Sequence, residues 1–283
     1  MKITIPTKRP YFKRIPKDLI YDFIRFNDYR VLFYLLLQQH IMTNSWEDNS
    51  VIFMDYSRAL SHINICPDRH KNANLEHFRH FVEELIQSND LILDENTTIK
   101  QPTLYVNKES DFFYPHEQFA ILYDFEINYI LNQSKDTLPN GVQRWKLLLV
   151  LAYLRLNINV RYGTAYNTKQ NRQEYPETYH QYFRNIADDL NLHKTAISKC
   201  IDALTEMGII AYKHTKIFTN YNKTIAGRTI FANQYKYDLQ QKGYLDSSYD
   251  FKKEIKECEM KLQGKDSKDL SIDTEDDMEL PFD

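Results

Sequence analysis

Residues 182–210 read YFRNIADDLNLHKTAISKCIDALTEMGII, and their apolar spacing predicts two helices joined by a short turn. The first helix is short and places Ile186, Ala187 and Leu190 on its inner face. We expect residues 191–193 to form the turn, with Leu192 as the apolar residue between the two helices. This stretch is the strongest structural signal in the chain.

The second helix is predicted over residues 194–207. Ile197, Ile201 and Leu204 follow the i, i+4, i+7 spacing of a single inward stripe. Gly208 follows directly and supplies the left-handed residue that commonly ends a helix.

Two predicted strands follow the second helix. The first runs from Ile209 to Phe218, a polar loop covers residues 219–228, and the second strand runs from Thr229 to Tyr235. Upstream, residues 143–157 predict a buried helix, and the insertion at residues 161–181 is expected to be an exposed loop that could also lie along DNA. The order of helix, turn, helix, glycine, strand, loop and strand resembles a winged helix-turn-helix.

The outward face of the second predicted helix carries Lys194, Thr195, Ser198 and Lys199. A recognition helix presents such positions to base edges in the major groove of DNA. The two strands and their loop add further cations suited to phosphate or minor-groove contacts, namely Lys213, Lys216, Lys223 and Arg228. Each of these cations alone could equally be an ordinary solvated charge.

The net charge of −3 hides an uneven distribution. Residues 1–17 carry six basic and no acidic side chains, and Arg9, Lys13 and Arg14 are expected to form part of an arm that grips phosphates. Residues 18–141 have a net charge of −10, residues 142–243 of +8, and residues 244–283 of −7. A cationic segment within an acidic chain indicates a polyanion-binding module, with a solvated basic face as the alternative.

The N-terminal half repeats the same plan more faintly. A buried helix over residues 30–42, a short one over residues 56–65 and a third with an inward stripe at Leu75, Phe78, Val82 and Leu85 precede a strand at residues 91–93. Asn89 takes the place of Gly208, because asparagine also adopts the left-handed conformation. The acidity of this half favours dimerisation or protein contact over DNA binding.

The predicted fold is therefore α+β and mostly helical, with two winged helix-turn-helix domains in tandem and a disordered acidic C-terminal tail. Its predicted parts are a basic N-terminal arm, a first winged-helix-like domain, a second DNA-binding domain and the tail, at residues 1–17, 18–125, 126–243 and 244–283.

Other functional classes find little support in the sequence. Nucleotide-binding glycine motifs, HExxH and paired CxxC motifs are absent, so we expect no enzymatic activity, no cofactor and no metal. The longest apolar stretch has eight residues, against about 18 for a membrane span. With no signal peptide evident and three widely spaced cysteines, we expect a cytoplasmic protein without membrane contact.

Residues 270–283 carry six acidic and no basic side chains. The segment ends in an acidic Pro-Phe sequence that resembles the C-terminal tip of bacterial single-stranded-DNA-binding proteins, although Asp283 follows the phenylalanine. That resemblance implies a partner-binding role for Asp276, Asp277, Leu280, Pro281 and Phe282. A generic solubilising tail is the alternative.

Two tandem winged helices without a ligand-sensing domain resemble the replication initiator proteins of plasmids and phages. The resemblance implies a homodimer that binds origin repeats in double-stranded DNA and recruits host replication proteins, in part through the tail. A transcriptional repressor that binds an operator is the alternative, and a protein-interaction scaffold is a further one.

Overall fold

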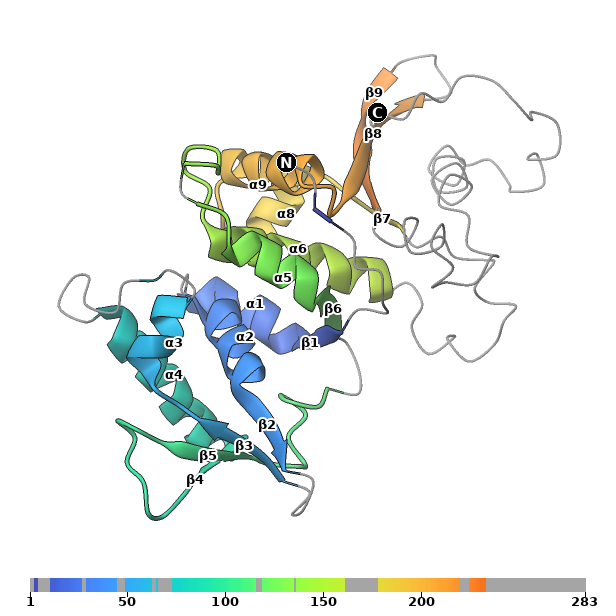
Figure 1. Cartoon of the computed structure of the whole chain (residues 1–283). Helices are drawn as coiled ribbons and strands as arrows, with labels where there is room; N and C mark the ends of the chain where they lie inside the picture. The colour runs from blue at the N-terminus through green and yellow to red at the C-terminus, as the bar shows by residue number, and fades with distance from the viewer. Residues whose placement is uncertain are drawn as a thin grey trace. The chain divides into compact units, whose positions relative to one another are not determined.

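The computed structural model describes residues 3–4, 11–26, 29–44, 49–62, 65, 73–115, 119–134, 136–160, 178–218 and 224–232. The described part of the chain is α+β, as predicted, with about half of the described residues helical and with small sheets. It divides into two compact units (Figure 1). We call residues 10–153 the N-terminal unit, and residues 1–9 together with 154–283 the C-terminal unit.

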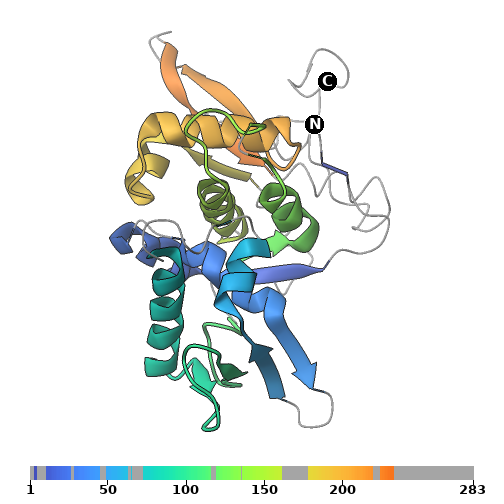
Figure 2. The same cartoon turned by 60° about the vertical axis from the view of Figure 1, so that its left-hand side comes forward.

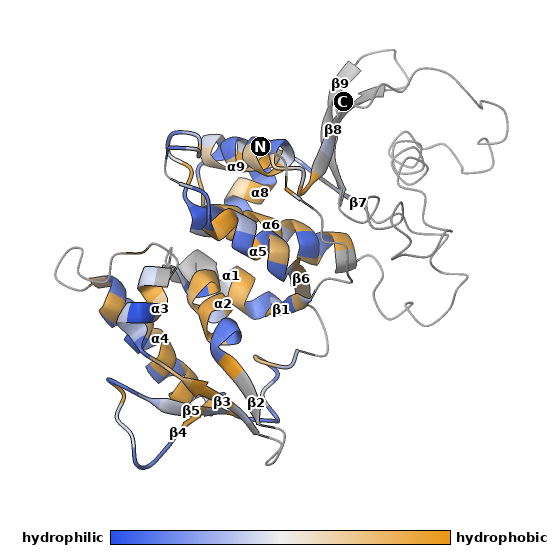
Figure 3. Ribbon diagram, viewed as in Figure 1, coloured by the Kyte–Doolittle hydropathy of each residue, from blue (hydrophilic) through white to orange (hydrophobic). Residues whose placement is uncertain are grey.

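The helices of the N-terminal unit are α1 (Lys17–Phe26), α2 (Arg30–His40), α3 (Tyr56–His62), α4 (Ala73–Gln87), α5 (Asp124–Leu131) and most of α6 (Arg144–Val160). Helix α2 is buried continuously from Val31 to Leu37, in keeping with its unbroken apolar run. Helix α4 is amphipathic, and its hydrophobic and hydrophilic residues alternate around the helix in Figure 3. The ring of Phe33 in α2 stacks on Phe78 in α4, with their centroids 4.7 Å apart.

Two antiparallel sheets complete the N-terminal unit. A two-stranded ribbon pairs β1 (Phe12–Pro16) with β6 (Phe119–Tyr123). A four-stranded sheet has the order β2-β3-β5-β4, and its strands are β2 (Ile41–Asn44), β3 (Asn49–Phe53), β4 (Leu91–Leu93) and β5 (Thr103–Val106).

The C-terminal unit contains the end of α6, α8 (Phe183–Asp189), α9 (Lys194–Glu206), and the strands β7 (Thr178–Gln181), β8 (Ala211–Phe218) and β9 (Thr224–Ala232). Its sheet has the order β7-β9-β8, and β8 and β9 form the hairpin coloured orange in Figure 2. The side chain of Arg155 in α6 is buried and donates a hydrogen bond to the carbonyl oxygen of Ile209, at 3.3 Å. The backbone N–H of Ile3 bonds the carbonyl oxygen of Met207, at 2.9 Å. Ile3 and Arg155, one from each of the two segments that make up this unit, therefore both contact the residues that follow α9.

The two units share one order of connections. Among the described elements of each, a helix is followed by a strand, two helices and two further strands, and the last strand lies between the other two. The elements are α2, β3, α3, α4, β4 and β5 in the N-terminal unit, and the end of α6 with β7, α8, α9, β8 and β9 in the C-terminal unit. Strand β2 is an addition to the N-terminal unit.

The helix ends repeat as well. Asn89 has φ 63° and Gly208 has φ 75°, which confirms the predicted equivalence of these two residues. After Asn89 the N–H of Asp90 bonds the carbonyl oxygen of Leu85 at 2.9 Å, and after Gly208 the N–H of Ile209 bonds that of Leu204 at 3.0 Å. These are the closing hydrogen bonds of a Schellman motif in both places.

Several local predictions need correction. The segment expected to be a loop up to residue 181 ends in strand β7, which completes the sheet. Strand β9 begins at Thr224 instead of Thr229, so Arg228 lies in a strand and not in a loop. Residues 12–16 form strand β1 instead of part of a free arm. Leu192, expected as the apolar residue between the two helices, is only partly buried, whereas Leu190 is fully buried.

The predicted acidic tail, including its partner-binding residues Asp276, Asp277, Leu280, Pro281 and Phe282, lies outside the described residues. Among the helices that the structure describes, none is long and apolar enough to cross a membrane.

Candidate nucleic-acid interface

Helix α9 begins at a capped turn. Asn191 in this turn has φ 48°, a left-handed conformation that asparagine tolerates. His193 is the N-cap residue, and its Nδ1 accepts a hydrogen bond from the backbone N–H of Thr195 at 3.3 Å. The same Nδ1 lies 2.8 Å from Thr195 Oγ1. The His193 side chain therefore caps the first turn of α9, a role that was not predicted from the sequence.

The inward side of α9 is fully apolar and fixes the direction of its outward side. Its buried residues are Ile197, Cys200, Ile201, Ala203 and Leu204. Lys194, Thr195 and Lys199 are exposed and Ser198 is partly exposed, so the structure brings together all four residues predicted on the outward face. Because the inward residues are packed in the core, they hold the backbone from which these four side chains project.

Charge is segregated along the exposed side of α9. Lys194 and Lys199 lie in its N-terminal half, while Asp202 and Glu206 are exposed in its C-terminal half. The first turn contains no acidic residue. The helix dipole favours negative charge at the N-terminus and positive charge at the C-terminus, which is the reverse of this arrangement. The N-terminal half of α9 therefore favours an external anion.

Asp202 joins α9 to strand β8. Its carboxylate accepts a hydrogen bond from the hydroxyl of Tyr212 at 2.9 Å, and a longer one from Ser198 Oγ at 3.5 Å. Burial, followed by the hydrogen bond from Tyr212 to Asp202, raises the pKa of the Tyr212 hydroxyl, so that it remains a donor. The Tyr212 ring packs edge-on against Phe183 of α8, with centroids 6.0 Å apart. This contact fixes the base of the hairpin beside α9.

The four cations predicted on the hairpin do not all lie in the loop between its strands. Lys213 and Lys216 lie in β8, where they pair in register with Ile230 and Ala226. Arg228 lies in β9, and Lys223 lies outside the described residues. The ladder shifts register between His214 and Lys216, which marks a bulge in the hairpin.

The N-terminal cations belong to a different surface. Lys13 Nζ donates to the carbonyl oxygen of Gln38 at 3.3 Å. Arg14 Nη1 donates to the carbonyl oxygen of Pro115 at 3.3 Å. Both residues lie in β1 of the N-terminal unit, and Arg9 lies outside the described residues. The structure therefore does not bring Lys13 and Arg14 together with α9 in one unit.

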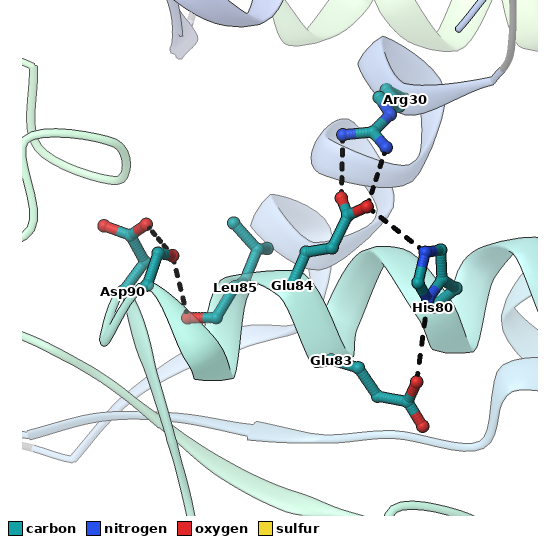
Figure 4. A network of polar contacts seen from close by, with 7 residues as sticks. Arg30, His80, Glu83, Glu84, Leu85 and Asp90 are labelled. Carbon is teal, nitrogen blue, oxygen red and sulfur yellow. Dashed lines mark hydrogen bonds and ion pairs between the residues drawn. The ribbon is translucent and has the colours of Figure 1, made fainter.

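Helix α4 is the counterpart of α9 in the N-terminal unit, and carboxylates surround its cations. Glu84 forms two contacts with Arg30, at 2.8 and 3.0 Å, and lies 3.3 Å from His80 Nε2 (Figure 4). Glu83 lies 3.7 Å from the other ring nitrogen of His80. Arg79 is held by Glu76 at 2.8 Å. The cations on this surface are therefore already held by carboxylates of the same unit.

Within the described part of the chain, no group of three or more His, Cys, Asp or Glu side chains is arranged to hold a metal ion. His193, Asp202 and Tyr212 are the residues of the candidate site that sequence reasoning missed. Histidine is not among the preferred N-cap residues, and the contact of Asp202 with Tyr212 joins a helix to a strand, so neither has a local sequence signal.

Comparison of the chain with protein-family models, with curated proteins and with solved structures finds no match. The function of the site is therefore inferred from its own residues and their geometry.

Proposed function

We propose that the C-terminal unit is a winged helix that binds double-stranded DNA sequence-specifically, with α9 as its recognition helix. The observation that supports this most is the cationic, hydroxyl-bearing N-terminal half of α9, on a helix whose opposite side is buried and which lies between a capped turn and a β-hairpin. The connection order and the β7-β9-β8 sheet order are those expected of a winged helix.

Each outward residue has a distinct role in this proposal. Thr195 and Ser198 donate or accept hydrogen bonds at base edges, and Lys194 and Lys199 contact bases or phosphates. The positive end of the α9 dipole favours a phosphate beside its first turn. Lys213, Lys216, Lys223 and Arg228 of the hairpin contact flanking phosphates or the minor groove.

We further propose that the chain initiates replication of a plasmid or phage by binding repeated sites at an origin. The repeated connection order of the two units supports a tandem winged-helix architecture, in which the acidic N-terminal unit serves homodimerisation or protein contact. The acidic tail over residues 244–283 is proposed to be disordered and to recruit host replication proteins.

Selection of binding sites from random-sequence duplex pools at physiological salt tests both levels of the proposal. Enrichment of directly repeated sites, also present near an origin of the same replicon, supports an initiator. A single palindrome overlapping a promoter indicates a repressor. No enrichment would contradict sequence-specific DNA binding and would favour a protein-interaction scaffold.

Point variants test the assigned face once a site is selected. We expect Thr195→Ala and Ser198→Ala to lower the preference for the selected site over a scrambled duplex, at about 1–3 kcal/mol per lost base contact. Glu206→Ala, at the far end of the same exposed side, is the matched control and should leave the preference unchanged. Unaltered preference in both threonine and serine variants would mean that α9 does not read the bases.

A further inference from the structure

The ribbon of β1 and β6 has one buried face and one outward face. On the buried face, Lys13 lies opposite Leu122 and Ile15 lies opposite Ala120. Leu122, Ile15 and Ala120 are fully buried. The alternate pairs join Phe12 to Tyr123, Arg14 to Ile121 and Pro16 to Phe119. Phe12 and Arg14 are exposed, and all three β6 residues in these pairs are partly exposed. The outward face therefore carries aromatic rings at both ends and an arginine between them, with Pro16 buried beside Phe119; the ribbon itself is labelled β1 and β6 in Figure 1.

Large rings are unusually accessible here. Tyr11, directly before β1, is 82% exposed, and Phe12 is 43% exposed. Phe12 packs edge-on against Tyr123 with centroids 6.4 Å apart, and Tyr123 lies 6.1 Å from Phe125. By contrast, Phe33, Tyr34 and Phe78 of the same unit are almost completely buried. The ribbon thus presents a group of rings to the solvent instead of to the core.

The charge of the ribbon is positive. The guanidinium of Arg14 lies 4.8 Å from the centroid of the Phe119 ring, and its hydrogen bond to Pro115 holds it there. Within the same unit, residues 10–17 carry Lys13, Arg14 and Lys17 and no acidic side chain. After β6, Glu126 is fully buried and accepts the N–H of Tyr123, while Asp124 is partly exposed and has its Oδ1 buried. An anionic ligand with flat apolar faces matches this combination of rings and cations.

We propose that the outward face of the β1–β6 ribbon binds single-stranded nucleic acid, with bases stacked on Tyr11, Phe12 and Tyr123 and phosphates near Arg14. Aromatic side chains on strands stack unpaired bases in a sequence-tolerant way, and arginine adds cation–π and phosphate contacts. A duplex keeps its base faces inside the stack, so the ribbon should discriminate against it. This site is independent of α9 and belongs to the other unit.

Fluorescence anisotropy of the full-length chain with labelled 20-nucleotide dT and U oligonucleotides and a 20-base-pair duplex tests the proposal. We expect the wild-type chain to bind at least one single strand. Each stacked base contributes roughly 5- to 150-fold in affinity, so Tyr11→Ala combined with Phe12→Ala should weaken single-strand binding by about 30-fold or more. Duplex binding should stay unchanged. The comparison of dT with U shows whether DNA or RNA is preferred.

Phe53→Ala is the matched control, because Phe53 is 58% exposed on β3 of the same unit but lies outside the ribbon. It should leave single-strand binding unchanged. Tyr11→Ala alone should still weaken single-strand binding several-fold. Because the Tyr11 ring is exposed, its removal should not disturb folding, so misfolding would not account for the weaker binding. Tyr11→Phe combined with Phe12→Tyr keeps both rings and should retain wild-type affinity.

Three results would overturn the proposal. One is the absence of single-strand binding by the wild-type chain, which would leave the rings as a protein-contact surface. Another is equal weakening by Phe53→Ala and by the ribbon variants. The third is loss of single-strand binding in a Lys194→Glu/Lys199→Glu variant with no effect of the ribbon variants. Because the duplex arm reports on α9 separately, failure of this proposal is distinguishable from failure of the duplex-binding proposal.

Discussion

Helices α4 and α9 occupy the same place in the repeated connection order, yet their surfaces are opposite in character. Both pack an apolar stripe inward, with Phe78, Val82 and Leu85 in α4 and Ile197, Ile201 and Leu204 in α9. Both end at a left-handed residue. On the outward side, however, Arg79 and His80 of α4 contact glutamates, while α9 carries its lysines in its N-terminal half and its exposed carboxylates in its C-terminal half. The shared core determines the topology, and the outward residues determine what each helix can bind.

The largest expected effect separates the cores of the two units. Phe78 is fully buried, stacks on Phe33 and meets Tyr56 edge-on with centroids 5.2 Å apart. We expect Phe78→Ala to lower the free energy of unfolding of the N-terminal unit by about 3–5 kcal/mol, measured by urea denaturation. His77→Ala, at the exposed neighbouring residue, should change it by less than about 0.5 kcal/mol. Similar values for the two variants would contradict the assigned inward stripe.

Charge reversal tests the contrast between the outward faces. We expect Lys194→Glu combined with Lys199→Glu to weaken duplex binding by about 100-fold, or about 2.7 kcal/mol. The negative slope of log K against log salt should become less steep by about 1.8, since two phosphate contacts are lost. Glu76→Lys combined with Glu83→Lys, the equivalent reversal on α4, should not weaken binding. A weaker duplex complex in the α4 variant alone would assign the DNA-binding face to the other unit.

The ion pairs of α4 give a smaller effect. Glu84→Gln removes the charge that faces Arg30, whose side chain is only 13% exposed. We expect a loss of about 1–2 kcal/mol in the free energy of unfolding, measured by urea denaturation. Glu83→Gln removes only the more distant and more exposed contact to His80 and should cost less than about 0.5 kcal/mol. Equal losses would show that Glu84 does not join α2 to α4.

The helix ends should respond least. A Cβ on Gly208 would have only Ile3 Cγ2 nearby, at 4.0 Å, so the cost of Gly208→Ala comes from the positive φ alone. We expect it to lower the free energy of unfolding by about 1 kcal/mol in thermal or urea unfolding. Asn89→Gly keeps the left-handed conformation accessible and should change stability by less than about 0.5 kcal/mol. A large loss for Asn89→Gly would mean that the Asn89 side chain itself stabilises the helix end.

Helical periodicity made the core of both units predictable from the sequence. The stripe at Ile197, Ile201 and Leu204 and the glycine that follows it are local signals, and the outward residues of α9 are their direct consequence. The equivalence of Asn89 and Gly208 was predictable as well, because each follows an inward stripe and each residue type adopts the left-handed conformation.

The remaining elements depend on distant partners. Strand β1 pairs with β6, which lies more than 100 residues away in sequence. Without this partner in view, the basic residues Lys13 and Arg14 of β1 were predicted to belong to an arm. Strand β7 has four residues and is recognisable only by its pairing with β9. The contact of Asp202 with Tyr212 likewise joins a helix to a strand, and no periodic pattern predicts it.

Cys200 lies fully buried on the inward side of α9, directly behind the proposed recognition face. A thiol in this position reacts with an alkylating reagent only when the helix opens, so its reaction rate measures local opening of the site. In a background with Cys66→Ser and Cys258→Ser, the chain therefore contains its own kinetic probe. A ligand that binds only the closed form slows the reaction of Cys200 in proportion to its occupancy, and thereby reports its affinity without any label on the DNA.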